Sequence, residues 1–149
     1  MKPKPFVLIT ALIYIGIAAS SIAFAHEAFM SRFDMYSNPQ CENYIVVENT
    51  GNHPIYAEPQ VIIKNPYNGV RNITYTFRMC TLEDGKCATP FTKSVSISPQ
   101  GTYQHTYRLN MNVNFNKYGD YHYTVSSDIT GDVEEHAEKT CGIHVRKNN

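Results

Sequence analysis

The stretch that decides the fold is NITYTFRMC, residues 72–80, in which apolar and polar side chains alternate. Ile73, Tyr75, Phe77 and Met79 occupy every second position of this stretch. Successive side chains of a β-strand point to opposite faces, so these four residues share one face and the polar residues between them share the other. The alternation predicts a strand with one face in a hydrophobic core and the other in water.

Two later stretches repeat this alternation, and their core-facing residues are Tyr121, Tyr123, Val125, Cys141, Ile143 and Val145. The candidate strands are residues 43–49, 60–65, 72–80, 91–98, 102–111, 120–129 and 140–147. The segments between them carry Gly, Pro, Asn or Asp, which turns prefer. A short helical segment is expected only in the acidic residues 132–139. The sequence therefore predicts an all-β fold, an antiparallel two-sheet immunoglobulin-like sandwich of about seven strands.

The first part of the chain predicts export. Two lysines form a basic start, residues 6–19 are apolar, and Ala23 and Ala25 stand where a signal peptidase needs small residues. Residues 1–25 are therefore expected to be a signal peptide, with an uncleaved membrane anchor as the alternative. The mature chain, residues 26–149, is expected to be one domain in the periplasm or outside the cell, with no stable membrane insertion after cleavage.

The four cysteines, Cys41, Cys80, Cys87 and Cys141, are expected to form two disulfides, because export places them in an oxidising compartment. More than one pairing is open to four cysteines. We expect Cys80 to pair with Cys87, since an Asp-Gly turn signal between them folds the chain back on itself. Cys41 then pairs with Cys141 by elimination. A zinc site made of the four thiolates is the weaker alternative, because the sequence has no C-x-x-C pair.

Four segments in order carry a resemblance to a known family: VVENTGN, TFRMCTLEDGK, SISPQGTYQHTYRL and YGDYHYTVSSDITGDVEE. Over about residues 44–135 they resemble bacterial extracytoplasmic immunoglobulin-like domains, nearest to the adhesion-associated CARDB type. The resemblance implies a β-sandwich. It also implies that Tyr121 or Tyr123 serves as a tyrosine corner, whose hydroxyl bonds back to the backbone across a turn.

The composition and the absence of certain motifs restrict the classes of function that we expect. Once two lysines leave with the signal peptide, 11 of the 13 Lys and Arg remain against 13 Asp and Glu, so nucleic acid is not expected as a partner. Neither nucleotide-binding glycine motifs nor a G-x-S-x-G nucleophile turn occurs. We therefore expect a binding module without catalysis or cofactor, whose partner is a protein or a cell-envelope component. Residues 50–56 and 65–70 are the expected recognition loops, because they present Tyr and Asn on a rigid scaffold.

The alternative function is a periplasmic copper carrier. If the signal peptide is cut after Ala25, His26 becomes the N-terminal residue, and its amine and imidazole can chelate Cu(II). Asp120 with His122 or His144 would complete the site, because residues two apart in a strand share a face. This set resembles the small periplasmic copper carriers of the CopC type, which implies copper bound on an immunoglobulin-like barrel.

Overall fold

The computed structural model describes residues 30–35 and 44–149, which form ten strands and no helix. The strands are β1 (Met30–Met35), β2 (Tyr44–Glu48), β3 (Gly51–Ala57), β4 (Pro59–Lys64), β5 (Arg71–Thr81), β6 (Phe91–Ile97), β7 (Thr102–Thr106), β8 (Leu109–Phe115), β9 (Gly119–Gly131) and β10 (Glu135–Arg146). The all-β class is confirmed, with ten described strands in place of about seven. The predicted signal peptide lies outside the described residues. Within those residues, no helix is long and apolar enough to cross a membrane.

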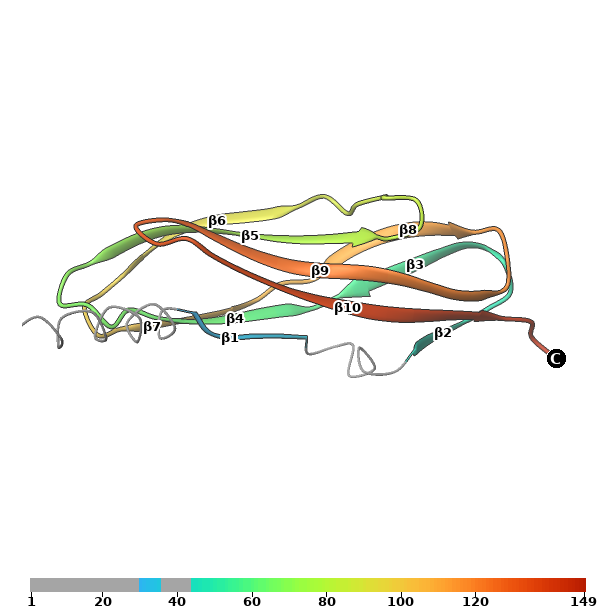
Figure 1. Cartoon of the computed structure of the whole chain (residues 1–149), viewed down its shortest axis with the longest axis horizontal. Coiled ribbons are helices and arrows are strands. Elements are labelled where there is room, and N and C mark those ends of the chain that lie inside the picture. The colour runs from blue at the N-terminus through green and yellow to red at the C-terminus, as the bar shows by residue number, and fades with distance from the viewer. Residues whose placement is uncertain (1–29, 36–43) are drawn as a thin grey trace, which may run out of the picture.

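The largest sheet has five strands in the order β2-β10-β9-β5-β6. Its centre is the antiparallel pair β9 and β10, which runs along most of the molecule in Figure 1. β2 pairs with β10 in parallel, from Tyr44 opposite Gly142 to Glu48 opposite Arg146. The expectation of a purely antiparallel fold is therefore wrong at this edge. A parallel pair needs a long crossover, and here most of the domain lies between the two strands.

The second layer consists of the sheets β1-β4-β7 and β3-β8. Only Glu58 separates β3 from β4, and only Tyr107 and Arg108 separate β7 from β8. These two breaks lie side by side, because the backbone amide of Tyr107 donates to the carbonyl of Pro59 at 3.1 Å. As a result β4 and β7 lie in one half of the elongated molecule, and β3 and β8 lie in the other half (Figure 1).

Three local predictions are wrong. Residues 102–111, expected as one strand, are divided between β7 and β8, and residues 50–56, expected as a loop, lie mostly in β3. The expected helical segment, residues 132–139, forms the β9–β10 turn and the first part of β10, where Glu135 lies opposite Ile129. The ladder with β9 overrides the local helical preference of this acidic segment, because propensity is a weak determinant against tertiary pairing.

The hydrophobic core lies between the two layers. Ile73, Tyr75, Phe77 and Met79 are all buried, as their alternation predicts. The opposite layer contributes further buried side chains, including Val61, Ile63, Leu109, Met111, Val113 and Phe115. Each large apolar side chain removed from water contributes about 1.5–3 kcal/mol, so this core is the main source of stability.

Tyr121 has the contacts expected of a tyrosine corner. Its hydroxyl accepts a hydrogen bond from the backbone amide of Lys117 at 3.2 Å and lies 3.1 Å from the carbonyl oxygen of the same residue. The bond runs from the start of β9 back across the turn that precedes it. Tyr123, the other candidate for this role, is fully buried in the core.

The predicted disulfide between Cys80 and Cys87 is present, with an S–S distance of 2.02 Å. It closes the loop after β5, where the backbone amide of Thr81 donates to the carbonyl of Lys86 at 2.8 Å. Cys141 is buried in β10, whereas Cys41 lies outside the described residues. The second disulfide therefore stays a prediction.

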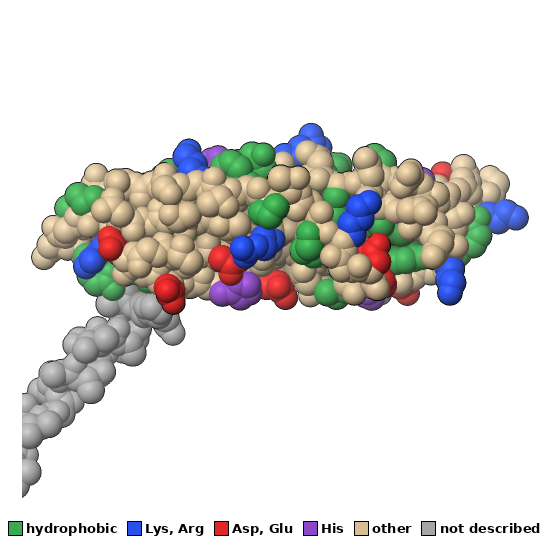
Figure 2. Space-filling view, turned by 90° about the horizontal axis from the view of Figure 1, so that it is seen from above, with side chains coloured by type: hydrophobic (Ala, Val, Ile, Leu, Met, Phe, Trp, Pro, Cys, Tyr) green, Lys and Arg blue, Asp and Glu red, His purple; other side chains and the backbone are tan. Residues whose placement is uncertain are grey.

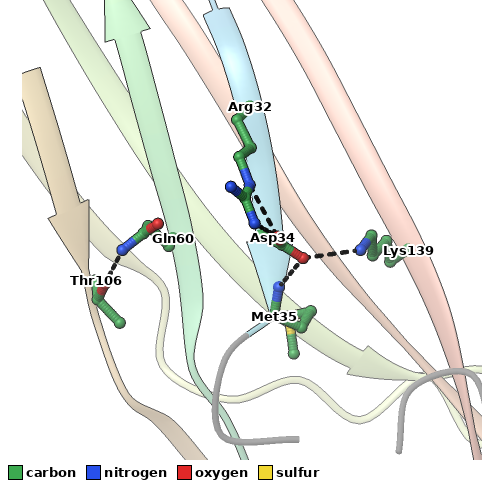
Figure 3. Close-up of polar contacts among 6 residues, drawn as sticks. All are labelled: Arg32, Asp34, Met35, Gln60, Thr106 and Lys139. Carbon is green, nitrogen blue, oxygen red and sulfur yellow. Dashed lines mark hydrogen bonds and ion pairs between the residues drawn. The ribbon is translucent and has the colours of Figure 1, made fainter. Parts of the chain in front are cut away.

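The N-terminal strand β1 is fastened to both layers (Figure 3). Asp34 accepts hydrogen bonds from Arg32 on its own strand and, at 3.2 Å, from Nζ of Lys139 on β10. These bonds, the one from Arg32 foremost, lower the pKa of Asp34 to about 2. Asp34 thus stays ionised and holds β1, which pairs with β4, against the five-stranded sheet.

Candidate functional site

Two of the predicted metal ligands contact each other, and a third contacts Glu83, which was not predicted as a ligand. Asp120 lies directly opposite His144 in the β9–β10 ladder, and Oδ1 of the aspartate is 2.6 Å from Nδ1 of the histidine. His122 contacts the disulfide loop instead, with Glu83 Oε1 2.7 Å from its backbone amide and 3.3 Å from Nδ1. The fourth predicted ligand, His26, lies outside the described residues.

No group of three or more His, Cys, Asp and Glu side chains arranged to hold a metal occurs in residues 30–35 and 44–149. A third pair, His136 with Asp128 at 2.6 Å, lies on the same face of the β9–β10 hairpin. Exposed pairs of this kind usually contribute little to stability. The copper hypothesis therefore depends on His26 to bring a further ligand to Asp120 and His144.

Of the two predicted recognition loops, residues 65–70 do form a loop, and Asn65 fixes its shape. This side chain is buried, and its Nδ2 lies within hydrogen-bond distance of the carbonyls of Gly69 at 2.8 Å, Ile97 at 3.0 Å and Ser98 at 3.0 Å. Its Oδ1 accepts a bond from the amide of Tyr67 at 3.1 Å. The β4–β5 loop is thus tied to the β6–β7 turn by one carboxamide.

Tyr75 and His105 form a partly buried polar contact beside the aromatic part of the core. The hydroxyl of Tyr75 lies 2.6 Å from Nδ1 of His105 and 3.1 Å from the hydroxyl of Tyr103. Burial raises the pKa of Tyr75, while burial and then Lys93 lower the pKa of His105. Both groups are therefore neutral near pH 7, and one hydrogen bond joins the hydroxyl of Tyr75 to Nδ1 of His105. The contact fixes the packing of β5 against β7.

A row of asparagines on β8 is the feature that the sequence predictions missed. The strand alternates strictly between buried residues, Leu109, Met111, Val113 and Phe115, and exposed asparagines, Asn110, Asn112 and Asn114. Opposite them on β3 stand Tyr56, Pro54 and Asn52, which are also exposed. We call these six exposed residues, Asn52, Pro54, Tyr56, Asn110, Asn112 and Asn114, the carboxamide face. Its signal in the sequence is LNMNVNFN, which the predicted strand boundary at residue 111 divided.

The asparagines of the carboxamide face lack the cross-strand hydrogen bonds that join polar side chains on the outer face of β5 and β6. There, Thr74 bonds Ser94 at 2.7 Å, and Thr76 bonds Thr92 at 3.0 Å, so the hydroxyls satisfy one another across the strands. The side chains of Asn52, Asn110, Asn112 and Asn114 make no such bond to any described residue. Asparagine is also depleted in strands, because its amide competes for the backbone in turns. The asparagines of β8 are therefore unfavourable for a strand, and no hydrogen bond to a described residue offsets that cost.

One end of the carboxamide face carries a fixed aromatic ring. The guanidinium carbon of Arg108 lies 4.1 Å from the ring centroid of Tyr56, and Nε of Arg108 is 3.4 Å from Oε1 of Glu58. Tyr56 remains 40% exposed. The arginine thus positions the ring and is itself neutralised by the glutamate.

Near the other end lies a small cleft of about 170 Å³ between the disulfide loop and β8. Its walls include Glu83, Asp84, Asn114, Asn116 and Tyr121. The hydroxyl of Thr81 and the amide of Lys86 lower the pKa of Asp84, so the cleft carries negative charge. Its volume is well below the roughly 300–1,000 Å³ of common small-molecule sites, so it admits at most one small unit of a larger ligand.

The surface seen in Figure 2 contains no broad apolar patch. Hydrophobic side chains there form small separate groups within a largely uncharged polar surface, and charged side chains are scattered among them. Large exposed apolar patches mark many protein interfaces. Recognition on this side of the molecule would therefore be polar.

No protein-family model matches the sequence, and no curated protein matches it. Among solved structures, the chain is similar to a β-glucuronidase from glycoside hydrolase family 2, with 18% identity over 74% of this chain and 11% of that chain, at a TM-score of 0.51. A Bacteroides uniformis β-glucuronidase matches with 9% identity over 72% of this chain and 12% of that chain, also at a TM-score of 0.51. The N-terminal domain of PorA matches at a TM-score of 0.35, with 13% identity over 72% of this chain and 91% of that chain.

The chain thus spans about a tenth of the length of the β-glucuronidases that it matches. At such low identity the likeness shows the fold alone, a β-rich domain. The activity of those enzymes does not extend to this chain through a match of that kind.

Proposed function

We propose that the protein is an exported, non-catalytic binding module that binds a cell-envelope component or a protein through the carboxamide face. An immunoglobulin-like sandwich of the CARDB type is its proposed scaffold. The observation that carries the proposal is the row of Asn110, Asn112 and Asn114, three exposed carboxamides without a hydrogen-bond partner among the described residues.

The chemistry of asparagine supports binding without catalysis. Each carboxamide offers two N–H donors and one carbonyl acceptor, and it does not titrate near neutral pH, so it recognises a ligand without transferring protons. Because the side chains stand on a paired strand, alternate residues are held about 6.6–6.8 Å apart. A ligand therefore meets donors and acceptors that are already in place, which lowers the entropic cost of binding.

Export is supported by the predicted signal peptide and by the disulfide between Cys80 and Cys87. Disulfides persist in the periplasm and outside the cell and are rare in the cytoplasm. We therefore place the module in the periplasm or on the outside of the cell, where envelope components are within its reach.

The test compares two double variants of the exported protein in cosedimentation with isolated cell envelopes. Asn112→Ala with Asn114→Ala changes the carboxamide face, and Thr92→Ala with Ser94→Ala changes alternate exposed positions of the edge strand β6. We expect the first variant to bind about tenfold more weakly, because two hydrogen bonds contribute about 1–3 kcal/mol together. The second variant should bind like the unchanged protein. Equal binding by both variants would exclude the carboxamide face.

A copper carrier is the second candidate, and the observation that favours it is the 2.6 Å contact between Asp120 and His144. This contact places one imidazole beside one carboxylate, two of the four predicted ligands. Cu(II) titration of the exported protein tests it. One-to-one binding that disappears in both His26→Ala and His144→Ala would support the carrier, and binding unaffected by either substitution would exclude it.

A further inference from the structure

We infer that the ligand of the carboxamide face is a neutral, polyhydroxylated chain, a glycan, that lies along β8. This inference rests on the proposed function, and it names the chemical class of the ligand. It follows from the charge, the hydrogen-bonding groups and the shape of the face.

The carboxamide face itself offers no charge to an ionic ligand, and the carboxylates of Glu83 and Asp84 lie in the cleft beyond Asn114. None of the six residues of the carboxamide face is charged. At the end of the face that carries Tyr56, Arg108 and Glu58 lie 3.4 Å apart and neutralise each other. Phosphate-rich polymers need clusters of Lys or Arg, and basic peptides need clusters of carboxylates. A neutral row of donors and acceptors is complementary to a neutral ligand.

Hydrogen-bonding capacity points to hydroxyl groups. A carboxamide presents a donor and an acceptor on the same carbon atom, and each hydroxyl of a sugar both donates and accepts. One asparagine can therefore bond two neighbouring hydroxyls of a sugar ring. Asn110, Asn112 and Asn114 repeat this arrangement along β8, so they match a ligand that repeats its own hydroxyls.

The ring of Tyr56 supplies the apolar part of such a site. The ring is 40% exposed and is held by Arg108, so it offers aromatic surface in a fixed position beside Asn110. The C–H groups of a sugar ring pack against aromatic carbon, while its hydroxyls remain free for the asparagines. A peptide would more readily add to a free strand edge through its backbone, which requires no row of asparagines.

The shape of the site favours a chain over a single sugar. The carboxamide face is the outer surface of a two-stranded sheet, and the nearest cleft holds only about 170 Å³. A single sugar would make few contacts on an open face. A chain that follows β8 would contact several asparagines at once, and the contributions of its units add through effective concentration.

The test treats isolated envelopes in two ways before cosedimentation with the exported protein. Periodate cleaves the C–C bonds between neighbouring hydroxyl-bearing carbons, whereas a protease removes envelope proteins. We expect periodate to abolish binding and protease treatment to leave it unchanged. Binding that is lost with protease and kept after periodate would overturn the glycan while leaving the proposed module intact.

Affinity electrophoresis in gels that contain a neutral glucan or a neutral mannan provides the second measurement. We expect one of these polymers to retard the unchanged protein and the Thr92→Ala, Ser94→Ala variant alike. Retardation should be about tenfold weaker for Asn112→Ala with Asn114→Ala, and also for Tyr56→Ala. Retardation that all of these variants retain would contradict a glycan on this face. A lysine variant, Asn112→Lys, that binds envelopes more tightly would instead indicate an anionic ligand and overturn the inference.

Discussion

Asp34 on β1 and Lys139 on β10 lie 3.2 Å apart, Oδ1 to Nζ, and this pair joins the N-terminal strand to the sheet of the other layer. The pKa of Asp34 is lowered from 3.8 to about 2, mainly by Arg32 and Lys139. A carboxyl whose pKa is lower in the folded state adds stability above its unfolded pKa and loses that contribution as the pH falls from about 4 to 2.

Asp34→Asn should therefore lower the free energy of unfolding at pH 7 by about 1 kcal/mol, the upper end for a partly exposed ion pair. The difference between the variant and the unchanged protein should shrink as the pH falls from 4 to 2. Urea denaturation at pH 7, 4, 3 and 2 measures it. A difference that stays constant over this range would contradict the role of Asp34.

Removal of the hydroxyl in Tyr75→Phe should destabilise the protein by about 1–3 kcal/mol, because Nδ1 of His105 then loses its buried partner. Tyr103→Phe serves as the control, since it leaves the bond between Tyr75 and His105 in place. We expect a clearly smaller loss for the control in urea denaturation. An equal loss for both variants would mean that the bond to His105 does not set the cost.

Asn65→Ala should be among the most destabilising single substitutions outside the apolar core, at about 3 kcal/mol, because the carbonyls of Gly69, Ile97 and Ser98 all lose the bond to this buried Nδ2. Asn65→Asp keeps the shape of the side chain but replaces the donating nitrogen with oxygen, so it should destabilise to a similar degree. Thermal unfolding measures both variants. If the aspartate variant were as stable as the unchanged protein, the Nδ2 bonds would not be what holds the loop.

Opening the disulfide in Cys80→Ser with Cys87→Ser should cost about 2 kcal/mol, the chain-entropy value for so short a loop. The loop also carries Glu83, whose carboxylate accepts a hydrogen bond from the backbone amide of His122. Hydrogen exchange at the amide of His122 should therefore accelerate in the double variant. Unchanged exchange at His122 would show that the loop stays docked on β9 without the disulfide.

The buried faces of the central strands could be predicted from the sequence because burial enforces strict alternation. Ile73 to Met79 is an example, and all four of its alternating apolar residues are buried. The pairing of β2 with β10 in parallel could not be predicted, because a strand's own pattern contains no information on the direction of its neighbour. The strand count differs for another reason: β1 and β3 were not expected as strands, and residues 102–111 are divided between β7 and β8.

The strand β3 was predicted as a loop because it contains Gly51, Asn52 and Pro54. These residues are tolerated because β3 pairs with β8 on one side only. Proline fits such an edge strand at a position where no backbone amide is needed for pairing. With β3 read as a loop and residues 102–111 read as one strand, the asparagines of β8 had no opposite strand. The carboxamide face therefore could not be assembled before the register of β3 on β8 was known.

The proposed function requires that the carboxamide face is the surface that binds. Hydroxyl-radical footprinting by mass spectrometry tests it most directly, because Tyr56 on the face and Tyr118 in the β8–β9 turn are both exposed, at 40% and 53%. On addition of isolated envelopes we predict that oxidation of Tyr56 falls at least severalfold while oxidation of Tyr118 stays unchanged. Unchanged oxidation of Tyr56 in envelope-bound protein would contradict the account.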